Sequence, residues 1–251
     1  MKFRLKALGL HLAASAAVLT IIFGSLYIGW YRWPGWYLAD VSQVVLVMTG
    51  VDLIVGPLLT FVIAASNKAR RVLARDIAVI VAVQLVALAY GAMSIWNGRP
   101  LYYAFSENVL QIVQAYDINS VEWALASRQK PQFAPHWYSL PRWIWAPLPQ
   151  DPKERERIFN SAIGGGDDVT SMPRYFNSWA AGLPGLKSQL KKVDDVGYFM
   201  PKDKKLLRQR MRDAGFDPDQ LNAIPLTGRG RPLLAVFDPV GVKLVAIFKA
   251  K

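Results

Sequence analysis

The chain has 251 residues, no cysteine and a formal net charge of +12 at pH 7, while 53% of its residues are hydrophobic and 19% are charged. Soluble domains average about 45–50% apolar and about 25% charged residues, so this composition indicates that apolar residues are concentrated in a membrane. The absence of cysteine excludes disulfides, cysteine-ligated zinc, iron–sulfur clusters and thiol catalysis.

Three long apolar runs before residue 99 predict three transmembrane helices. The spans cover about 7–30, 41–66 and 77–97, and each reaches the ~20 residues that cross a ~30 Å hydrocarbon core. A cleaved signal peptide is the alternative for the first run, but signal peptides have a shorter apolar region of about 7–15 residues. We therefore expect residues 1–98 to form a three-helix anchor in the lipid bilayer.

The basic residues beside these runs predict the orientation of the anchor. Seven of them lie at the N-terminus and between the second and third runs, namely Lys2, Arg4, Lys6, Lys68, Arg70, Arg71 and Arg75. The loop between the first two runs contains only Arg32. Loops rich in Lys and Arg stay on the cytoplasmic side, so we expect a cytoplasmic N-terminus. Residues 99–251 then lie outside, which in a bacterium is the periplasm.

Residues 99–251 predict an α+β domain that begins and ends with a β-hairpin. Short apolar stretches at 101–105 and 109–113 flank Ser106-Glu107-Asn108. Further stretches at 232–237 and 242–248 flank Asp238-Pro239-Val240-Gly241, whose Asp, Pro and Gly are typical of a tight turn. The C-terminal strands are apolar on both faces, so we expect this hairpin in the domain interior rather than at an edge.

Helices and one loop are predicted between the two hairpins. A helix is expected at about 119–127, and another begins at Asp151-Pro152-Lys153-Glu154 and ends at Gly164. A basic helix should cover about 202–214, and Asp217-Pro218-Asp219-Gln220 has the form of a further helix start. Residues 131–150 contain five prolines and four Trp or Tyr residues, which predicts an extended aromatic loop.

Few residues have the arrangement that catalysis or metal binding needs. The two histidines are His11, within the first apolar run, and His136, in the proline-rich segment. Histidine-based metal sites and hydrolytic triads need several converging groups, so we expect no catalytic residues, no metal and no cofactor. The glycine-rich stretch 164–168 lacks the Lys-Ser/Thr ending of a nucleotide-binding loop, and we interpret it as a linker.

The basic helix offers a candidate surface. Its residues Lys204, Lys205, Arg208 and Arg212 would suit an anionic lipid or an acidic protein surface. The alternative is an amphipathic helix whose charges are only solvated. Nucleic acid is not an expected partner, because this helix belongs to the predicted outer domain.

Asp52 is the single acidic residue in the second span. A carboxylate within a membrane costs a few kcal/mol and usually faces a bundle interior or marks a functional site. Gly56 and Pro57 follow it and indicate a close helix approach or a kink. Asp52 is either a structural hydrogen-bond acceptor or, with Gly56 and Pro57, a contact for a partner's membrane helix. The hydroxyl groups of Thr20, Tyr90 and Ser94 lie at a similar level, and we expect them as candidate hydrogen-bond donors to the Asp52 carboxylate.

Five sequence motifs carry a resemblance to a known family. They are KFRLKAL at 2–8, GWYRWPGWY at 29–37, GVDLIVGPLLT at 50–60, GRPLYYAF at 98–105 and PLTGR at 225–229. With these motifs the chain resembles the TfpX/TfpZ-type type IV pilin accessory proteins. The resemblance covers the first half of the chain closely and the outer domain mainly at its C-terminal end.

The resemblance implies an inner-membrane accessory factor whose partner is the major type IV pilin. Such a factor would promote pilin stability or assembly, or tune pilus extension and retraction, by direct contact without catalysis. It implies no catalytic or binding residues and no oligomeric state. The alternative is a membrane-anchored pilin-modifying transferase or protease. Such an enzyme would use a Ser–Lys pair or clustered acidic residues such as Asp167, Asp168 or Asp194-Asp195.

Overall fold

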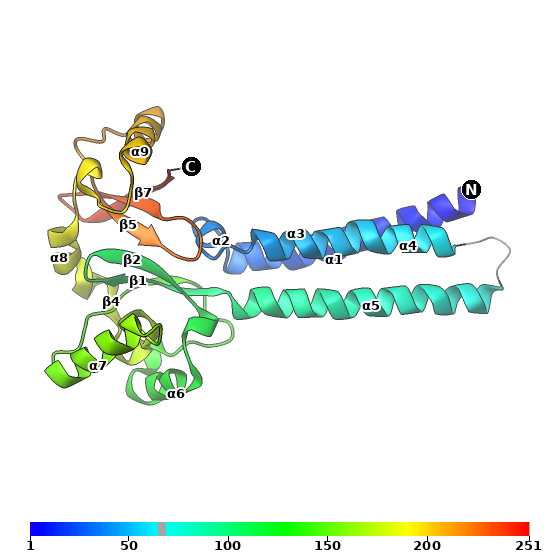
Figure 1. Cartoon of the computed structure of the whole chain (residues 1–251), viewed down its shortest axis with the longest axis horizontal. Helices are drawn as coiled ribbons and strands as arrows, with labels where there is room; N and C mark the ends of the chain where they lie inside the picture. Colours follow the sequence, from blue (N-terminus) through cyan, green and yellow to red (C-terminus); the bar gives the residue numbers. More distant parts are fainter. Residues whose placement is uncertain (65–68, 251) are drawn as a thin grey trace. The chain divides into compact units, whose positions relative to one another are not determined.

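A computed structural model describes residues 1–64 and 69–250 (Figure 1). The chain divides into two compact units. The helical unit comprises residues 1–32 and 40–98, and the sheet unit comprises 33–39 and 99–251. The end of the second predicted span at 65–66 and the basic residue Lys68 lie outside the described residues.

The helical unit contains the three predicted apolar helices. The first is α1 (Lys2–Gly29), and the third is α5 (Arg70–Asn97). The second consists of α3 (Ser42–Gly50), the π-helix η1 (Val51–Val55) and α4 (Gly56–Ile63) in direct succession. Each of the three is long and apolar enough to cross a membrane.

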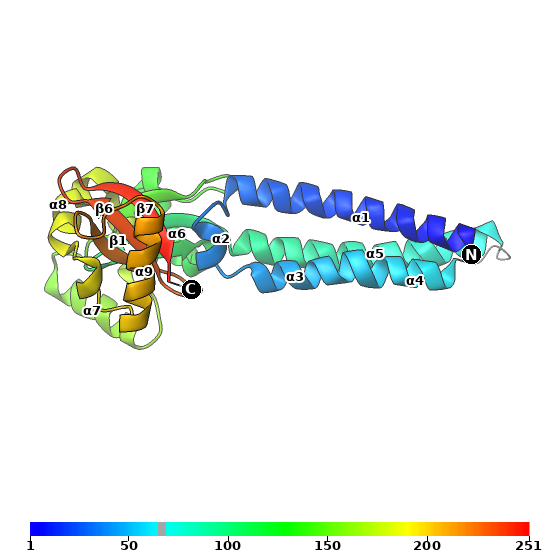
Figure 2. The same cartoon turned by 90° about the horizontal axis from the view of Figure 1, so that it is seen from above.

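The three helices run side by side, and the second packs against both others (Figure 2). Their outer surfaces are apolar, with Leu10 on α1 75% exposed, Leu46 on α3 73% exposed and Val86 on α5 71% exposed. A bundle in water carries polar residues on its outer face. The exposed side chains of this unit therefore match a hydrocarbon environment better than water.

The sheet unit contains a mixed sheet of seven strands among the described residues, in the order β4-β3-β1-β2-β5-β6-β7. Neighbouring strands are antiparallel except for the parallel pairs β1–β3 and β2–β5. The strands are β1 (Pro100–Ser106), β2 (Val109–Gln114), β3 (Arg142–Trp145), β4 (Asn177–Ser178), β5 (Asn222–Thr227), β6 (Leu233–Asp238) and β7 (Lys243–Lys249).

Both predicted hairpins are confirmed, as β1–β2 and β6–β7. The interior position expected for the C-terminal hairpin is correct only for β6, which is buried along nearly its whole length. It is wrong for β7, which ends the sheet and is partly exposed. Lys243 and Lys249 occupy the two ends of β7, and lysine is a residue that edge strands commonly carry.

The helices of the sheet unit are α2 (Gly35–Leu38), α6 (Ser120–Gln129), α7 (Pro152–Ile163), α8 (Trp179–Gln189) and α9 (Pro201–Asp213). The three predicted helices correspond to α6, α7 and α9. The predicted start of α7 is confirmed, because the Asp151 carboxylate accepts a hydrogen bond from the Lys153 amide at 3.2 Å. After α9, Gly215 adopts a φ of +83°, which glycine adopts readily.

Two predictions for the sheet unit are wrong. The segment 131–150 is not a loop throughout, because β3 forms within it. Its Trp-Ile-Trp core suits a strand, and Pro141 and Pro147 lie outside the strand. The residues Asp217-Pro218-Asp219-Gln220 form a turn rather than a helix, in which the Asp217 carboxylate accepts from the Asp219 amide at 3.0 Å. Strand β5 begins at Asn222, which leaves no room for a helix.

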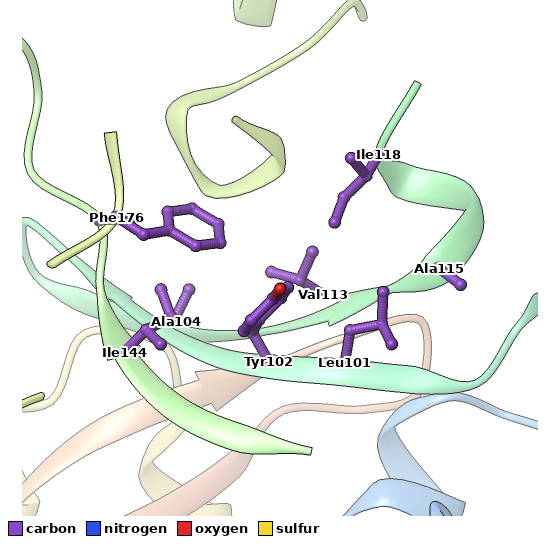
Figure 3. Packing of buried hydrophobic residues seen from close by; sticks show 9 residues of the cluster. Leu101, Tyr102, Ala104, Val113, Ala115, Ile118, Ile144 and Phe176 are labelled. Atoms are coloured by element: carbon purple, nitrogen blue, oxygen red, sulfur yellow. The ribbon is translucent and has the colours of Figure 1, made fainter. Parts of the chain in front are cut away.

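The sheet unit has two main apolar cores. One covers β1, β2 and β3, where the Tyr102 and Phe176 rings meet edge to face at 5.1 Å (Figure 3). The other lies between α9 and the C-terminal strands, with Leu207 and Met211 from the helix and Leu234 from β6. Burial of these side chains stabilises the unit by roughly 25 cal/mol per Å² of apolar surface removed from water.

Residues 33–39 are held against the turn after β5. The Gly230 amide donates to the Leu38 carbonyl at 3.1 Å. A Cβ atom at Gly230 would lie 2.3 Å from the Tyr37 carbonyl oxygen, and one at Gly228 would lie 2.6 Å from the Leu38 carbonyl oxygen. Both glycines are therefore needed for this close backbone approach between residues 37–38 and 228–230.

Candidate functional site

Asp52 lies in the π-helix in the middle of the second apolar helix and is only 5% exposed. Pro57 follows shortly after this turn. A proline within a helix lacks an amide hydrogen and crowds the carbonyl four residues earlier, here that of Leu53. The widened π-turn lies where this crowding occurs. Single π-turns within α-helices frequently mark functional sites.

The partner of Asp52 is Gln84 of α5, whose side-chain amide donates to the Asp52 carboxylate at 3.3 Å. The expectation that hydroxyl groups of Thr20, Tyr90 or Ser94 satisfy Asp52 is wrong. The Thr20 hydroxyl donates to the Ala16 carbonyl at 2.7 Å, and Tyr90 is 79% exposed.

The start of α5 explains this difference. The helix begins at Arg70, seven residues before the apolar run that starts at Ile77. At 1.5 Å per residue, Gln84 lies about 21 Å from the start of α5 and Asp52 lies about 16 Å from the end of α4, so the two levels agree to about one helical turn. Counting from Ile77 would bring Tyr90 to that level instead.

Gly56 provides the space in which the Gln84 amide lies. A Cβ atom at Gly56 would be 2.0 Å from Gln84 Nε2 and 2.4 Å from its Cδ. Any larger residue would therefore displace the amide from Asp52. The Gln84 side chain is 9% exposed, and its Oε1 atom is buried without a hydrogen-bond partner. The predicted close helix approach at Gly56 is thus an approach of α5 to the second helix.

A second polar pair joins α1 to α4. The His11 Nδ1 atom lies 2.6 Å from the Thr60 hydroxyl oxygen, and Thr60 is 2% exposed. Sequence analysis found Asp52 and His11 but not their partners Gln84 and Thr60. Gln84 and Thr60 could have been identified from the sequence, because each is a polar side chain within an apolar run.

The two polar pairs lie in one cavity of about 320 Å³ between α1 and α5, with the second helix as its floor. We call this cavity the polar groove. Its polar lining residues are His11, Ser15, Asp52, Thr60 and Gln84, and its remaining lining is apolar. The groove can accept hydrogen bonds through the Asp52 carboxylate and the Gln84 carbonyl oxygen. Within residues 1–64 and 69–250, no cluster of three or more His, Asp or Glu side chains suits a metal ion.

Three of the acidic residues named for the enzyme alternative have a hydrogen-bond or ion-pair partner. The Asp168 carboxylate accepts from the Val169 amide at 2.6 Å and thereby caps a short 3₁₀ helix. Asp167 accepts a hydrogen bond from the Asn119 side chain. Asp194 pairs with Arg208 at 2.8 Å. His136 lies in an exposed loop and stacks on Tyr138.

The basic helix α9 directs part of its charge toward its own unit. The Arg208 guanidinium contacts Asp194 and Asp219, each at 2.8 Å. The Lys204 ammonium donates to the Asp194 carbonyl at 2.6 Å. Lys205 and Arg212 are exposed. Two of the four predicted surface residues, Lys204 and Arg208, therefore bind the segment before α9, and Arg208 also binds the turn after it.

A network of charges around the buried Glu122 joins three elements of the sheet unit. Arg174 contacts Glu122 of α6 and Glu154 of α7, each at 3.2 Å. Glu154 also accepts hydrogen bonds from Arg157 at 2.8 Å and from Tyr175 at 2.5 Å, which lower its pKa to about 2. Burial raises the pKa of Glu122, against the opposing effect of Arg174. The opposite charges of this network neutralise one another, although Glu122 Oε2 and Arg174 Nε have no hydrogen-bond partner among the described residues.

Comparison with known proteins finds three similar sequences from Dichelobacter nodosus. A fimbrial assembly protein of serogroup I is 25% identical over 192 residues, which cover 75% of this chain and 72% of that protein. A fimbrial assembly protein of serogroup E1 is 26% identical with the same coverage. A fimbrial assembly protein of serogroups C1 and C2 is 28% identical over 116 residues, which cover 46% and 88%. Neither a protein-family model nor a solved structure matches the chain.

Proposed function

We propose that this chain is an inner-membrane accessory factor for type IV pilin, in line with its resemblance to TfpX/TfpZ-type proteins. It promotes pilin stability or assembly into pili, or tunes pilus extension and retraction. The observation that carries this proposal is similarity over 75% of the chain to a protein named for fimbrial assembly. The major pilin is the proposed partner.

The proposed topology has a cytoplasmic N-terminus, three membrane spans within residues 1–98 and a periplasmic domain from residue 99. Three helices of sufficient length and apolarity support it, as do their exposed apolar side chains. The basic residues near the start of α1 and α5 support the orientation. A pilin has to pass from the membrane into a pilus outside it, so a factor with parts in both places suits this task.

The proposed mode of action is direct contact without catalysis. The acidic residues of the enzyme alternative support this proposal, because Asp168 caps a helix and Asp194 forms an ion pair. Asp168 lines a cavity with Ser106 and Thr170, but its carboxylate already accepts hydrogen bonds from the Val169 amide and the Thr170 hydroxyl. The lining of that cavity contains no His or Lys that could take a proton from a hydroxyl nucleophile.

Deletion of the gene in its native host tests the proposed function. We expect fewer assembled pili, counted by electron microscopy, and recovery when the full chain is supplied from a plasmid. The intact mass of pilin, measured by mass spectrometry, should be the same with and without the chain. Normal piliation of the deletion strain would contradict the proposal, and a change in pilin mass would support the enzyme alternative instead.

A further inference from the structure

We propose that the polar groove binds a transmembrane helix of the fimbrial subunit, and that this helix presents a hydrogen-bond donor to Asp52 and Gln84. The identity of the partner rests on the proposed function. The form and chemistry of the occupant follow from the groove itself.

The lining of the groove has the form of a helix-binding surface. From α1 it includes Ala7, Leu10, His11, Ala14, Ser15 and Val18, which share one face because they are spaced three or four residues apart. From α5 it includes Ile77, Val81, Gln84, Leu85 and Leu88, which also share one face. Each face extends over twelve residues, or about 17 Å from the first to the last. An occupant that contacts two parallel helical faces over three turns is itself elongated, as a helix is.

Small side chains on α1 allow such a helix to approach closely. Ala7, Ala14 and Ser15 lie on the groove face of α1. Helices associate in membranes through small residues, because packing between backbones replaces the hydrophobic effect that is absent in lipid. Ala14 is exposed in the described structure, so its surface is available for contact.

The polar atoms in the groove define what the occupant must supply. Asp52 accepts one hydrogen bond, from Gln84, and no Lys or Arg among the described residues forms an ion pair with it. The Gln84 Oε1 atom is buried without a donor, although the side chain is more than nine-tenths buried. Both atoms are acceptors, so a ligand that satisfies them donates hydrogen bonds.

The environment favours a protein helix over lipid as the occupant. Acyl chains contain no hydrogen-bond donor, so lipid in the groove would leave the Gln84 Oε1 atom unpaired in an apolar medium, which costs free energy. A helix carrying a cationic or amide side chain at the level of Asp52 satisfies both acceptors and fills the apolar walls. Polar residues that face a bundle interior are commonly used for such contacts.

Site-specific crosslinking tests the groove in the full chain. The protein has no cysteine, so one introduced cysteine is a unique attachment point for a photoactivatable thiol reagent. Ala13 and Ala14 are adjacent, exposed alanines of α1, but only Ala14 lines the groove. In membranes of host cells that produce the fimbrial subunit, we expect Ala14→Cys to capture the subunit several-fold more efficiently than Ala13→Cys. Equal capture, no capture, or capture of only a second copy of the chain would overturn the proposal.

A glycine pair provides a second test that does not depend on the probe position. Gly56→Ala would push Gln84 away from Asp52, whereas a Cβ atom at Gly50 has no neighbour within 4 Å. Both are glycines of the second apolar helix. We expect Gly56→Ala to lower capture through Ala14→Cys several-fold, relative to the amount of chain in the membrane, and Gly50→Ala to leave it unchanged. Unchanged capture in both variants would overturn the role of the Asp52–Gln84 pair.

The two proposals fail in different ways. If the deletion strain makes normal pili, the proposed function is wrong whatever the crosslinking shows. If pili require the chain but Ala13→Cys and Ala14→Cys capture the subunit equally, only the groove is excluded as its binding site.

Discussion

Both units bury charged side chains, but only in the sheet unit is the buried charge described here neutralised by a side chain of opposite charge. In the sheet unit, Arg174 lies between Glu122 and Glu154 at 3.2 Å from each, so the buried charges neutralise one another. In the helical unit, Asp52 is equally buried, and among the described residues its hydrogen-bond donor is the neutral Gln84 amide at 3.3 Å, with His11 lining the same groove. A closed network serves the fold of its own unit. For the carboxylate that faces the polar groove, with the neutral Gln84 side chain beside it, we propose a role in binding a partner.

The closed network has a clear structural task. Glu122 belongs to α6, Glu154 belongs to α7, and Arg174 lies on the short 3₁₀ helix Pro173–Tyr175. One guanidinium therefore ties two helices to a connecting segment. In the polar groove, the neutral Gln84 amide does not neutralise the charge of the Asp52 carboxylate.

Breaking the closed network should have the largest effect on stability. Arg174→Met leaves Glu122, which is 5% exposed, without its opposite charge. Removing one partner of a buried ion pair typically costs about 3–5 kcal/mol. We expect a clearly lower thermal unfolding midpoint for the full chain in detergent micelles. The control Arg212→Met, at an exposed position of α9, should leave the midpoint unchanged, and equal midpoints for both variants would show that the network is not structural.

Acid should weaken the same network by a smaller amount. A carboxyl whose pKa is lower in the folded state stabilises the fold above its unfolded pKa, and this contribution is lost as the pH falls. For Glu154 the loss should occur between its ordinary value of 4.5 and about 2, because Arg157 and Tyr175 hold its pKa down. Glu122 acts in the opposite direction, since burial raises its pKa.

The measurement is the unfolding midpoint of the full chain in detergent between pH 5 and pH 2, compared with Glu154→Gln. The variant has no ionisable group at position 154. Its unfolding midpoint should therefore fall less steeply over this pH interval. An identical slope in the two proteins would mean that Glu154 is not a source of the acid sensitivity.

Much of the fold could be predicted from local sequence signals. The length of the apolar runs predicts the three apolar helices. The Asp151-Pro152 pair predicts the start of α7, and the turn residues at 238–241 predict the C-terminal hairpin. Two other elements contain a proline, which argues against a strand or a helix when the sequence alone is considered. Strand β5 contains Pro225 and helix α8 contains Pro184, and neither element was predicted. In both cases contacts with neighbouring elements outweigh the local preference against proline.

The site was less predictable than the fold. Asp52, Gly56 and Pro57 were found because a carboxylate, a glycine and a proline are unusual together in an apolar helix. Gln84 was missed because the level of a residue depends on where its helix begins, and α5 extends through the charged segment before its apolar run. Apolar run length alone does not contain that information.

The most direct test of a partner-binding role for the polar groove replaces both Asp52 and Gln84, in the double variant Asp52→Leu with Gln84→Leu. Exchanging both partners of a buried hydrogen bond for apolar groups of similar size is often neutral or stabilising. If the pair serves a partner, the full chain should be as abundant and as thermally stable as the native protein, while pili are lost and capture of the fimbrial subunit through Ala14→Cys disappears. A stable double variant that supports normal piliation and normal capture would contradict the account.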